Sequence, residues 1–217
     1  NGRALTDDWM KLCARHNITL SISLPGLTTL RHLTDSDTDP AQLLRHFTRA
    51  KELGCETVVG IAVTKLNLSE LYETIAAAVI AGADYILLNR FLPGGRGLSH
   101  PELRLSHADV LKMADEAEAA LSRVRIHGHL GTEMPRCLIN PSKYKWLKIS
   151  TGCAAANEYF CVGANGRIRA CNHSPVELCR WDGYESLPTN PDWTRYTHRD
   201  YYPSRCKGCG ERSICAG

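Results

Sequence analysis

The sequence feature that restricts the fold most is a cysteine-rich segment near the C-terminal end of the chain. Seven of the ten cysteines fall within it, at Cys153, Cys161, Cys171, Cys179, Cys206, Cys209 and Cys215. Thiolates are soft metal ligands, and two of them separated by two residues can bind one metal centre from a single turn. The pair Cys206-Lys-Gly-Cys209 has this spacing. The segment is therefore predicted to bind zinc or iron–sulfur clusters.

A β-hairpin is expected inside this segment. The dipeptide Asn165-Gly166 favours a tight turn because both residues tolerate positive φ. The stretches 159–162 and 167–170 would form its arms. Such a hairpin would bring Cys153 and Cys171 toward a shared centre.

The distribution of the other cysteines favours metal over disulfides, which are the alternative. The first 130 residues contain only Cys13 and Cys55, each expected to be buried as a small hydrophobic residue. Disulfide-rich chains are usually small secreted domains, and this N-terminal part is typical of a cytosolic α/β protein. His127 and His129 have no carboxylate or cysteine pair beside them and are interpreted as ordinary polar residues.

Charge and hydropathy exclude two classes of partner. The net charge of +3 is small and there is no basic run, so nucleic acid is not an expected partner. No apolar stretch reaches the roughly 20 residues that a membrane span needs, and the start of the chain lacks a signal-peptide pattern. We therefore expect no membrane association and a cytoplasmic location.

The first 130 residues alternate strand and helix patterns. Helix-start signals lie at Thr6, Asp39, Asn67 and Ser106, and a long polar loop is expected up to Asp39. Apolar, branched stretches predict strands at 18–24, 57–63 and 85–88, with a short strand at 124–126. This order is typical of half of a parallel barrel or open sheet. We predict an α/β domain over residues 1–130 and a small cysteine-rich domain over 131–217.

Polar residues follow these predicted strands. Ligands of parallel sheets bind beyond the C-terminal ends of the strands. Polar residues also occur there simply because loops are exposed to solvent. The candidate binding residues are Ser21, Ser23, Thr64, Asn67, Asn89 and Arg90. The glycine-rich loop 91–97 lacks the lysine and hydroxyl residue of a P-loop, so it does not predict a phosphate site.

These residues together resemble a radical S-adenosylmethionine (SAM) enzyme with a C-terminal SPASM domain, which carries auxiliary iron–sulfur clusters. The stretches Asn1-Gly2, SISLPG (21–26), VTKLN (63–67) and LNRFLPGGRG (88–97) resemble the second half of that family's partial (βα)6 barrel, which is TIM-like. Cys153, Gly166-x4-Cys171 and Cys206-x2-Cys209-x5-Cys215 resemble the SPASM (twitch-type) cysteine pattern. The resemblance covers nearly the whole chain.

The resemblance also implies that the chain is a fragment. The family's radical-generating Cys-x3-Cys-x2-Cys motif would precede Asn1, and the next SPASM cysteine would follow Gly217. The full-length enzyme would use a [4Fe-4S] cluster to reduce SAM to methionine and a 5′-deoxyadenosyl radical, which abstracts a hydrogen atom from the substrate. This fragment alone is expected to be inactive.

Site residues follow from the same resemblance. Ser23, Asn89 and Arg90 would contact bound SAM, with Ser21, Thr64 and Asn67 as further candidates. The metal ligands would be Cys153 and Cys171 for a first auxiliary [4Fe-4S] cluster and Cys206, Cys209 and Cys215 for a second. Cys161 and Cys179 are additional cysteines that either complete a site or are structural. No catalytic side chain is identified.

Two departures from the family pattern restrict the substrate. In relatives that mature sulfatases an aspartate follows the cysteine equivalent to Cys171, but here the residue is Asn172, which cannot take up a proton as a carboxylate does. Pro25 stands where many relatives have an aspartate. The remaining large group crosslinks ribosomally made peptides, so the expected partners are a peptide or protein substrate and a leader-peptide-binding domain.

Two other functions stay open at this stage. The cysteine-rich segment could be a zinc-binding module on a non-catalytic α/β scaffold, with Cys171 or Cys179 completing the four ligands that zinc needs. The second of these functions is that of a non-radical barrel enzyme acting on small phosphorylated molecules. For that function only Arg90 and Arg96 offer positive charge near the strand ends.

Overall fold

The computed structural model describes residues 2–34 and 36–215. The chain forms two compact units. Unit 1 contains the residues up to Thr132 together with Leu138–Ser150, and unit 2 contains Glu133–Cys137 together with the residues from Thr151 onward. The chain thus crosses between the units more than once, whereas a single division after residue 130 was expected.

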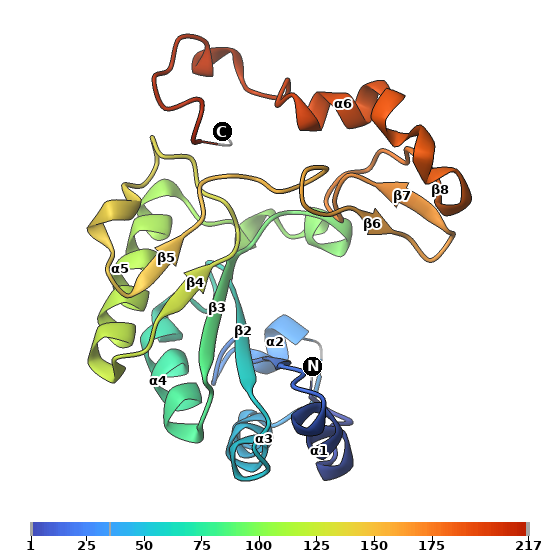
Figure 1. Ribbon diagram of the computed structural model, residues 1–217. Helices are drawn as coiled ribbons and strands as arrows, with labels where there is room; N and C mark the ends of the chain where they lie inside the picture. Colours follow the sequence, from blue (N-terminus) through green and yellow to red (C-terminus); the bar gives the residue numbers. More distant parts are fainter. Residues whose placement is uncertain (1, 35, 216–217) are drawn as a thin grey trace. The chain divides into compact units, whose positions relative to one another are not determined.

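Unit 1 is a mixed α/β unit built on one parallel sheet (Figure 1). Its strands follow chain order across the sheet: β1 (Leu20–Ser23), β2 (Thr57–Val63), β3 (Tyr85–Arg90), β4 (Gly128–Leu130) and β5 (Leu147–Ile149). Its helices are α1 (Asp7–Arg15), α2 (Leu30–Thr34), α3 (Pro40–Glu52), α4 (Leu71–Ala81) and α5 (His107–Val124). Short 3₁₀ helices lie at Leu68–Glu70, Gly95–Ser99, Pro101–Leu103 and Pro141–Lys143. The predicted α/β class is confirmed.

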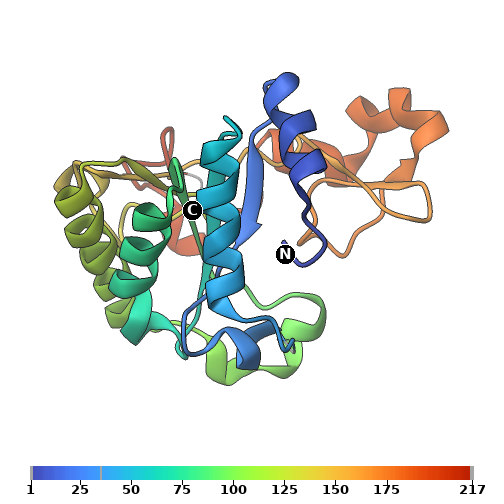
Figure 2. The same ribbon diagram turned by 90° about the horizontal axis from the view of Figure 1, so that it is seen from below.

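One face of this sheet is buried beneath helices. Alternate residues of a strand share a face, and the side chains on this one are at most 2% exposed: Ile22, Val59, Ile61, Ile86 and Leu88. Helices α3, α4 and α5 lie side by side (Figure 2) and contribute the fully buried Phe47, Ile75 and Leu121. Each such side chain stabilises the fold by about 1.5–3 kcal/mol when removed from water.

The lone cysteines of unit 1 have the predicted role. Cys13 of α1 and Cys55 ahead of β2 are both buried and pack with Met10 and Ala50. They act as small apolar groups that join α1 to α3.

Local sequence signals set several helix ends as predicted. The Asp39 side chain accepts a hydrogen bond from the backbone N–H of Ala41 at 3.0 Å, ahead of Pro40 at the start of α3. Ser106 and Asp109 form a reciprocal capping box at the start of α5. Gly82 ends α4 with φ +112°, a conformation that glycine adopts most easily.

Two local predictions are wrong. The expected strand at 124–126 is absent because Arg125 takes the left-handed conformation, φ 57°, and ends α5, so that β4 starts only at Gly128. The loop up to Asp39 contains the short helix α2. Leu30 is the one buried residue of α2. A single buried side chain gives no hydrophobic periodicity from which a helix could be predicted.

Strand β5 was not predicted, and its position depends on a distant carboxylate. Glu118 of α5 accepts hydrogen bonds from the backbone N–H groups of Lys145, Trp146 and Leu147, with closest distances of 2.8, 3.0 and 2.8 Å. Three backbone donors at the start of β5 are thereby satisfied by one side chain.

Unit 2 is built on a small antiparallel sheet (Figure 1). Its strands are β6 (Cys161–Val162), β7 (Arg167–Arg169) and β8 (Cys179–Arg180), followed by 3₁₀ helices at Trp181–Thr189 and Ser204–Cys206 and the helix α6 (Pro191–Thr197). The predicted hairpin is confirmed: β6 pairs with β7, and Gly166 turns with φ +72°. The core of this unit is small, with Ile168 and Ala170 fully buried.

No helix within the described part of the chain is both long enough and apolar enough to span a membrane.

Candidate functional site

Unit 1 has an open hollow on the sheet face opposite the helices. Its volume is about 410 Å³, and it is lined by alternate residues of three strands and by the loops that follow them. The strand and strand-end residues that line it are Ser21, Ser23, Gly60, Ala62, Thr64, Leu87 and Asn89. Four of the six predicted binding residues therefore face one space: Ser21, Ser23, Thr64 and Asn89.

Asn67 has a structural position instead. It is 2% exposed, and its Oδ1 accepts hydrogen bonds from the backbone N–H and the hydroxyl of Thr64 at 2.7 and 3.0 Å. Its Nδ2 donates to the carbonyl of Ala62 at 2.9 Å and to the carbonyl of Pro25. All four hydrogen-bonding positions of the amide are thus used inside the protein. Asn67 joins the end of β2 to the loop after β1 and makes no helix cap.

Arg90 lies on the other side of the sheet from Asn89. The two residues are adjacent on β3, and adjacent strand residues point to opposite faces. Arg90 shares its face with Leu88, which is fully buried, and it is not among the residues that line the hollow.

Glu70 contacts the loop after β1 and was missed by the sequence analysis. Its carboxylate accepts hydrogen bonds from the backbone N–H and hydroxyl of Thr28 at 2.7 and 2.8 Å, and from the backbone N–H of Thr29 at 3.1 Å. The Thr29 hydroxyl also donates to it. This carboxylate therefore fixes the loop after β1. No sequence signal could have found it, because the partners lie 41 and 42 residues apart in the chain.

We expect Glu70→Gln to lower stability in a pH-dependent way. Burial alone would raise the pKa of Glu70, but hydrogen bonds from Thr29 and Thr28 outweigh it and hold the pKa below its usual value. A carboxylate with a lowered pKa stabilises the fold above its unfolded pKa, and that stabilisation is lost as the pH falls through the folded value. Thermal unfolding should show a loss of about 1 kcal/mol at neutral pH that shrinks once the pH falls below the usual glutamate pKa of about 4.3.

Glu73→Gln is the matched control for this measurement, because Glu73 lies exposed on α4 close to Glu70 in the chain. Its loss at neutral pH should be smaller than that of Glu70→Gln, because an exposed carboxylate in the first turn of a helix contributes only about 0.3–1 kcal/mol through the helix dipole. A Glu70→Gln deficit that stays constant from pH 3 to pH 8 would contradict the assigned role of the Glu70 carboxylate.

Three cysteines of unit 2 gather around Tyr159. Burial raises the pKa of the Cys153 thiol, and the nearby Glu133 and Cys171 raise it further. Burial also raises the pKa of Tyr159 to about 12, with Cys171, Cys153 and Cys161 adding to the effect. These mutual effects require the groups to be neighbours. Cys153 and Cys171 are thus close enough to influence each other electrostatically, which is compatible with the predicted shared centre.

A second tyrosine lies in the same neighbourhood. Burial and the nearby Cys153 raise the pKa of Tyr201 to about 12. Cys153 thus influences the pKa values of both Tyr159 and Tyr201. Neither tyrosine nor Glu133 carries a spacing signal in the sequence.

The two additional cysteines lie on opposite faces of the small sheet. Cys161 of β6 is opposite Arg169 of β7, whereas Cys179 of β8 is opposite Ile168. Adjacent residues of β7 point to opposite faces, so the two thiols do as well. Cys161 lies on the side of Asn172, with its Sγ 3.9 Å from the Asn172 Oδ1. Cys161 therefore lies on the face of the small sheet that is near Asn172, and Cys179 lies on the other face.

The last three cysteines lie on two consecutive turns. A hydrogen bond of 3.2 Å from the Cys209 N–H to the Cys206 carbonyl closes the first turn, in which Gly208 has φ +81°. The Cys215 N–H donates to the Glu211 carbonyl at 2.9 Å and closes the second. The Cys215 thiolate position is buried and accepts a hydrogen bond from the backbone N–H of Arg136 at 3.5 Å.

The thiols of unit 2 are donors for either an iron–sulfur cluster or a zinc ion. No disulfide joins cysteines within residues 2–34 and 36–215, and no group of three His, Cys, Asp or Glu side chains that could hold a metal ion is found among the same residues. Zinc needs four donors around a single ion, whereas each thiolate of a [4Fe-4S] cluster binds a different iron atom.

Comparison with known proteins gives a result only at the level of structure. No protein-family model matches the chain, and no curated protein matches it either. Among solved structures, Streptococcus suis SuiB matches 100% of this chain and 54% of its own, with a TM-score of 0.74 and 16% identity. The protein anSMEcpe, with bound AdoMet and the Kp18Cys peptide, matches 100% of this chain and 63% of its own, with a TM-score of 0.68 and 13% identity.

SuiB has also been solved with S-adenosylmethionine and with its precursor peptide SuiA. Both neighbours are SPASM-containing radical SAM enzymes, so the predicted resemblance is confirmed for the fold. The chain spans about half of the length of SuiB and less than two thirds of anSMEcpe.

Proposed function

We propose that this chain is part of a radical SAM enzyme that modifies a peptide, and that it supplies half of a partial (βα)6 barrel and a SPASM domain. The observation that carries the proposal is that the SuiB-like fold extends over the whole chain and includes the unit in which Cys153, Cys161 and Cys171 are grouped. A fold without such thiols would support only a shared scaffold.

The hollow of unit 1 is the proposed SAM site. SuiB and anSMEcpe, which have a similar fold, were both solved with this molecule bound. The hydroxyls of Ser21 and Ser23 and the amide of Asn89 face the hollow and can hydrogen-bond the ribose or the methionyl group. Asn67 and Glu70 hold the surrounding loops. When bound together with a [4Fe-4S] cluster, SAM supplies a radical that abstracts a hydrogen atom from the substrate.

The proposed auxiliary centres lie in unit 2. Cys153 and Cys171, joined by Cys161, would ligate the first, and Cys206, Cys209 and Cys215 the second. Thiolates of this kind need a reducing compartment, which supports a cytoplasmic location.

A ribosomally made peptide is the proposed substrate, and formation of a crosslink is the proposed outcome. SuiB bound to SuiA and anSMEcpe bound to Kp18Cys support a peptide as the substrate class. Asn172 argues against sulfatase maturation, because its amide interacts with the Cys161 thiol and cannot accept a proton as an aspartate would. A leader-peptide-binding domain outside these residues is part of the same proposal.

Metal analysis of the anaerobically reconstituted 217-residue chain tests the function. We expect iron and acid-labile sulfide in about equal amounts, since a [4Fe-4S] cluster contains the two in that ratio. Zinc without labile sulfide would instead identify a zinc module and end the radical-enzyme proposal. In a longer chain that contains a Cys-x3-Cys-x2-Cys motif, release of 5′-deoxyadenosine from SAM is the corresponding test of activity.

A further inference from the structure

A second hollow lies wholly within unit 2. Its volume is about 550 Å³, within the range of small-molecule and side-chain pockets. Its lining residues come from the start of the hairpin, the 3₁₀ segment and α6: Ala156, Asn157, Glu158, Tyr159, Phe160, Tyr184, Glu185, Leu187, Pro188 and Trp193. None of the functions discussed above uses this hollow.

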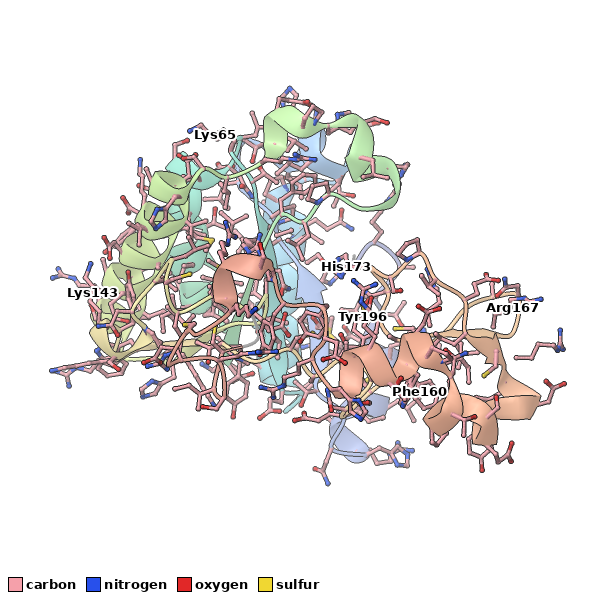
Figure 3. All side chains as sticks on the ribbon, turned by 90° about the horizontal axis from the view of Figure 1, so that it is seen from above. Lys65, Lys143, Phe160, Arg167, His173 and Tyr196 are labelled. Atoms are coloured by element: carbon pink, nitrogen blue, oxygen red, sulfur yellow. The ribbon has the colours of Figure 1, made fainter. Side chains whose placement is uncertain are left out.

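Aromatic rings form its walls. The ring centroid of Phe160 lies 6.2 Å from that of Trp193 in an edge-to-face arrangement and 6.1 Å from that of Trp181. Tyr184 stacks on Trp181 at 5.7 Å. Figure 3 shows Phe160 beside the helical ribbon that carries Trp193. These contacts pack the rings against one another along the hollow.

Much of this aromatic surface is exposed. Tyr159 is 43% exposed, Tyr184 48% and Trp181 53%. Large aromatic side chains that gather at one exposed place mark interaction sites, whereas single exposed ones need no explanation. The surface is therefore suited to a partner.

The charge of the hollow is negative. Glu158 and Glu185 are its only charged lining residues, and both are exposed. Neither forms an ion pair with a residue in the part of the chain that the structure describes. The faces of aromatic rings attract cations, and two carboxylates add to that attraction.

We propose that this hollow binds a lysine or arginine side chain of the peptide substrate, with an apolar neighbour of that residue packed on the aromatic wall. The assignment of this cation to the substrate peptide rests on the proposed function. A second copy of this chain fits less well, because a two-fold contact places the same patch on both partners and would bring the Glu158 and Glu185 carboxylates of both copies together.

The direct test is a comparison of two peptides by fluorescence anisotropy. The probe is fluorescein-labelled Gly-Leu-Lys-Phe-Gly, and the matched peptide has norleucine in place of lysine, which keeps the apolar stem and removes the charge. We expect the lysine peptide to bind about tenfold more tightly. The net charge of the chain is +3, so a preference for the cation cannot come from overall charge.

Two double variants then locate the site. Glu158→Gln with Glu185→Gln should abolish the preference for lysine. Glu73→Gln with Asp200→Asn removes the same charge from exposed positions outside the hollow and should leave the preference unchanged. Trp193→Ala should weaken the binding of both peptides, because it removes part of the aromatic wall that both would contact.

Three outcomes would overturn the proposal. They are equal binding of the two peptides, an equal loss in both double variants, and a dimer in light scattering that Trp193→Ala dissociates, which would identify a second copy as the occupant. The measurement needs neither iron nor SAM. Its failure is therefore distinguishable from a failure of the radical-enzyme proposal, which metal analysis tests separately.

Discussion

Replacing Cys171 with serine is expected to remove most of the iron that the reconstituted chain binds at its first centre. Cys171 raises the pKa of both Cys153 and Tyr159, and Cys153, Cys161 and Cys171 are all partly buried. A serine hydroxyl does not replace a thiolate as a soft ligand. Iron and labile sulfide per chain should fall by about one cluster, measured against the unmodified protein.

The same variant should also lower the melting temperature of unit 2. The core of that unit is small, and metal binding supplies folding free energy where a core does not. Without iron, Cys171→Ser and the unmodified chain should unfold at nearly the same temperature. A difference that persists in the iron-free proteins would mean that Cys171 stabilises the unit by packing alone.

Two further cysteines serve as matched controls. Cys137 is exposed, so Cys137→Ser should retain all of the iron. Cys179→Ser should also retain the first centre, because Cys179 lies on the opposite face of the small sheet from Cys161. Cys161→Ser, by contrast, should lose iron. The reverse order for Cys161 and Cys179 would refute the grouping of Cys161 with Cys153 and Cys171.

The elements that could be predicted from sequence are those whose signals are local. The stretch Thr57–Val63 is nearly all apolar and forms β2 with the predicted bounds. Asp39-Pro40 and Ser106 start helices by hydrogen bonds to residues two or three positions away. Asn165-Gly166 forms the turn of the predicted hairpin. In each case the residues that decide the conformation are neighbours in the chain.

The features that could not be predicted depend on distant partners. Strand β5 is positioned by Glu118, 27 to 29 residues earlier in the chain. The loop after β1 depends on Glu70, and the surroundings of Cys153 include Glu133 and Tyr201. No periodicity or spacing links these pairs, because their proximity is created by the tertiary fold.

The prediction of binding residues at the strand ends was also limited by contacts that the sequence does not reveal. The expectation that polar residues after parallel strands meet at one edge of the sheet placed Ser21, Ser23 and Asn89 in a common hollow. It could not separate Asn67, because an amide that binds a ligand and an amide that braces two loops look alike in sequence. Only the hydrogen-bond partners distinguish them.

Asn67→Ala is therefore expected to destabilise unit 1 strongly. The substitution leaves the backbone N–H of Thr64 and the carbonyls of Ala62 and Pro25 without the side-chain partner that each has in the fold. Buried polar groups that lose a partner cost about 1–3 kcal/mol each when nothing replaces it. We expect a total loss of about 3 kcal/mol, which corresponds to a fall in melting temperature of roughly 10 °C.

Ser23→Ala separates a bracing role from a binding role in this region. Ser23 is exposed and lines the hollow, so its replacement should leave the melting temperature unchanged and weaken the binding of SAM measured by calorimetric titration. Asn67→Ala should instead lower the melting temperature strongly. If Asn67→Ala melts like the unmodified protein and loses SAM binding instead, then the amide of Asn67 contacts the ligand and the structural role argued for it is wrong.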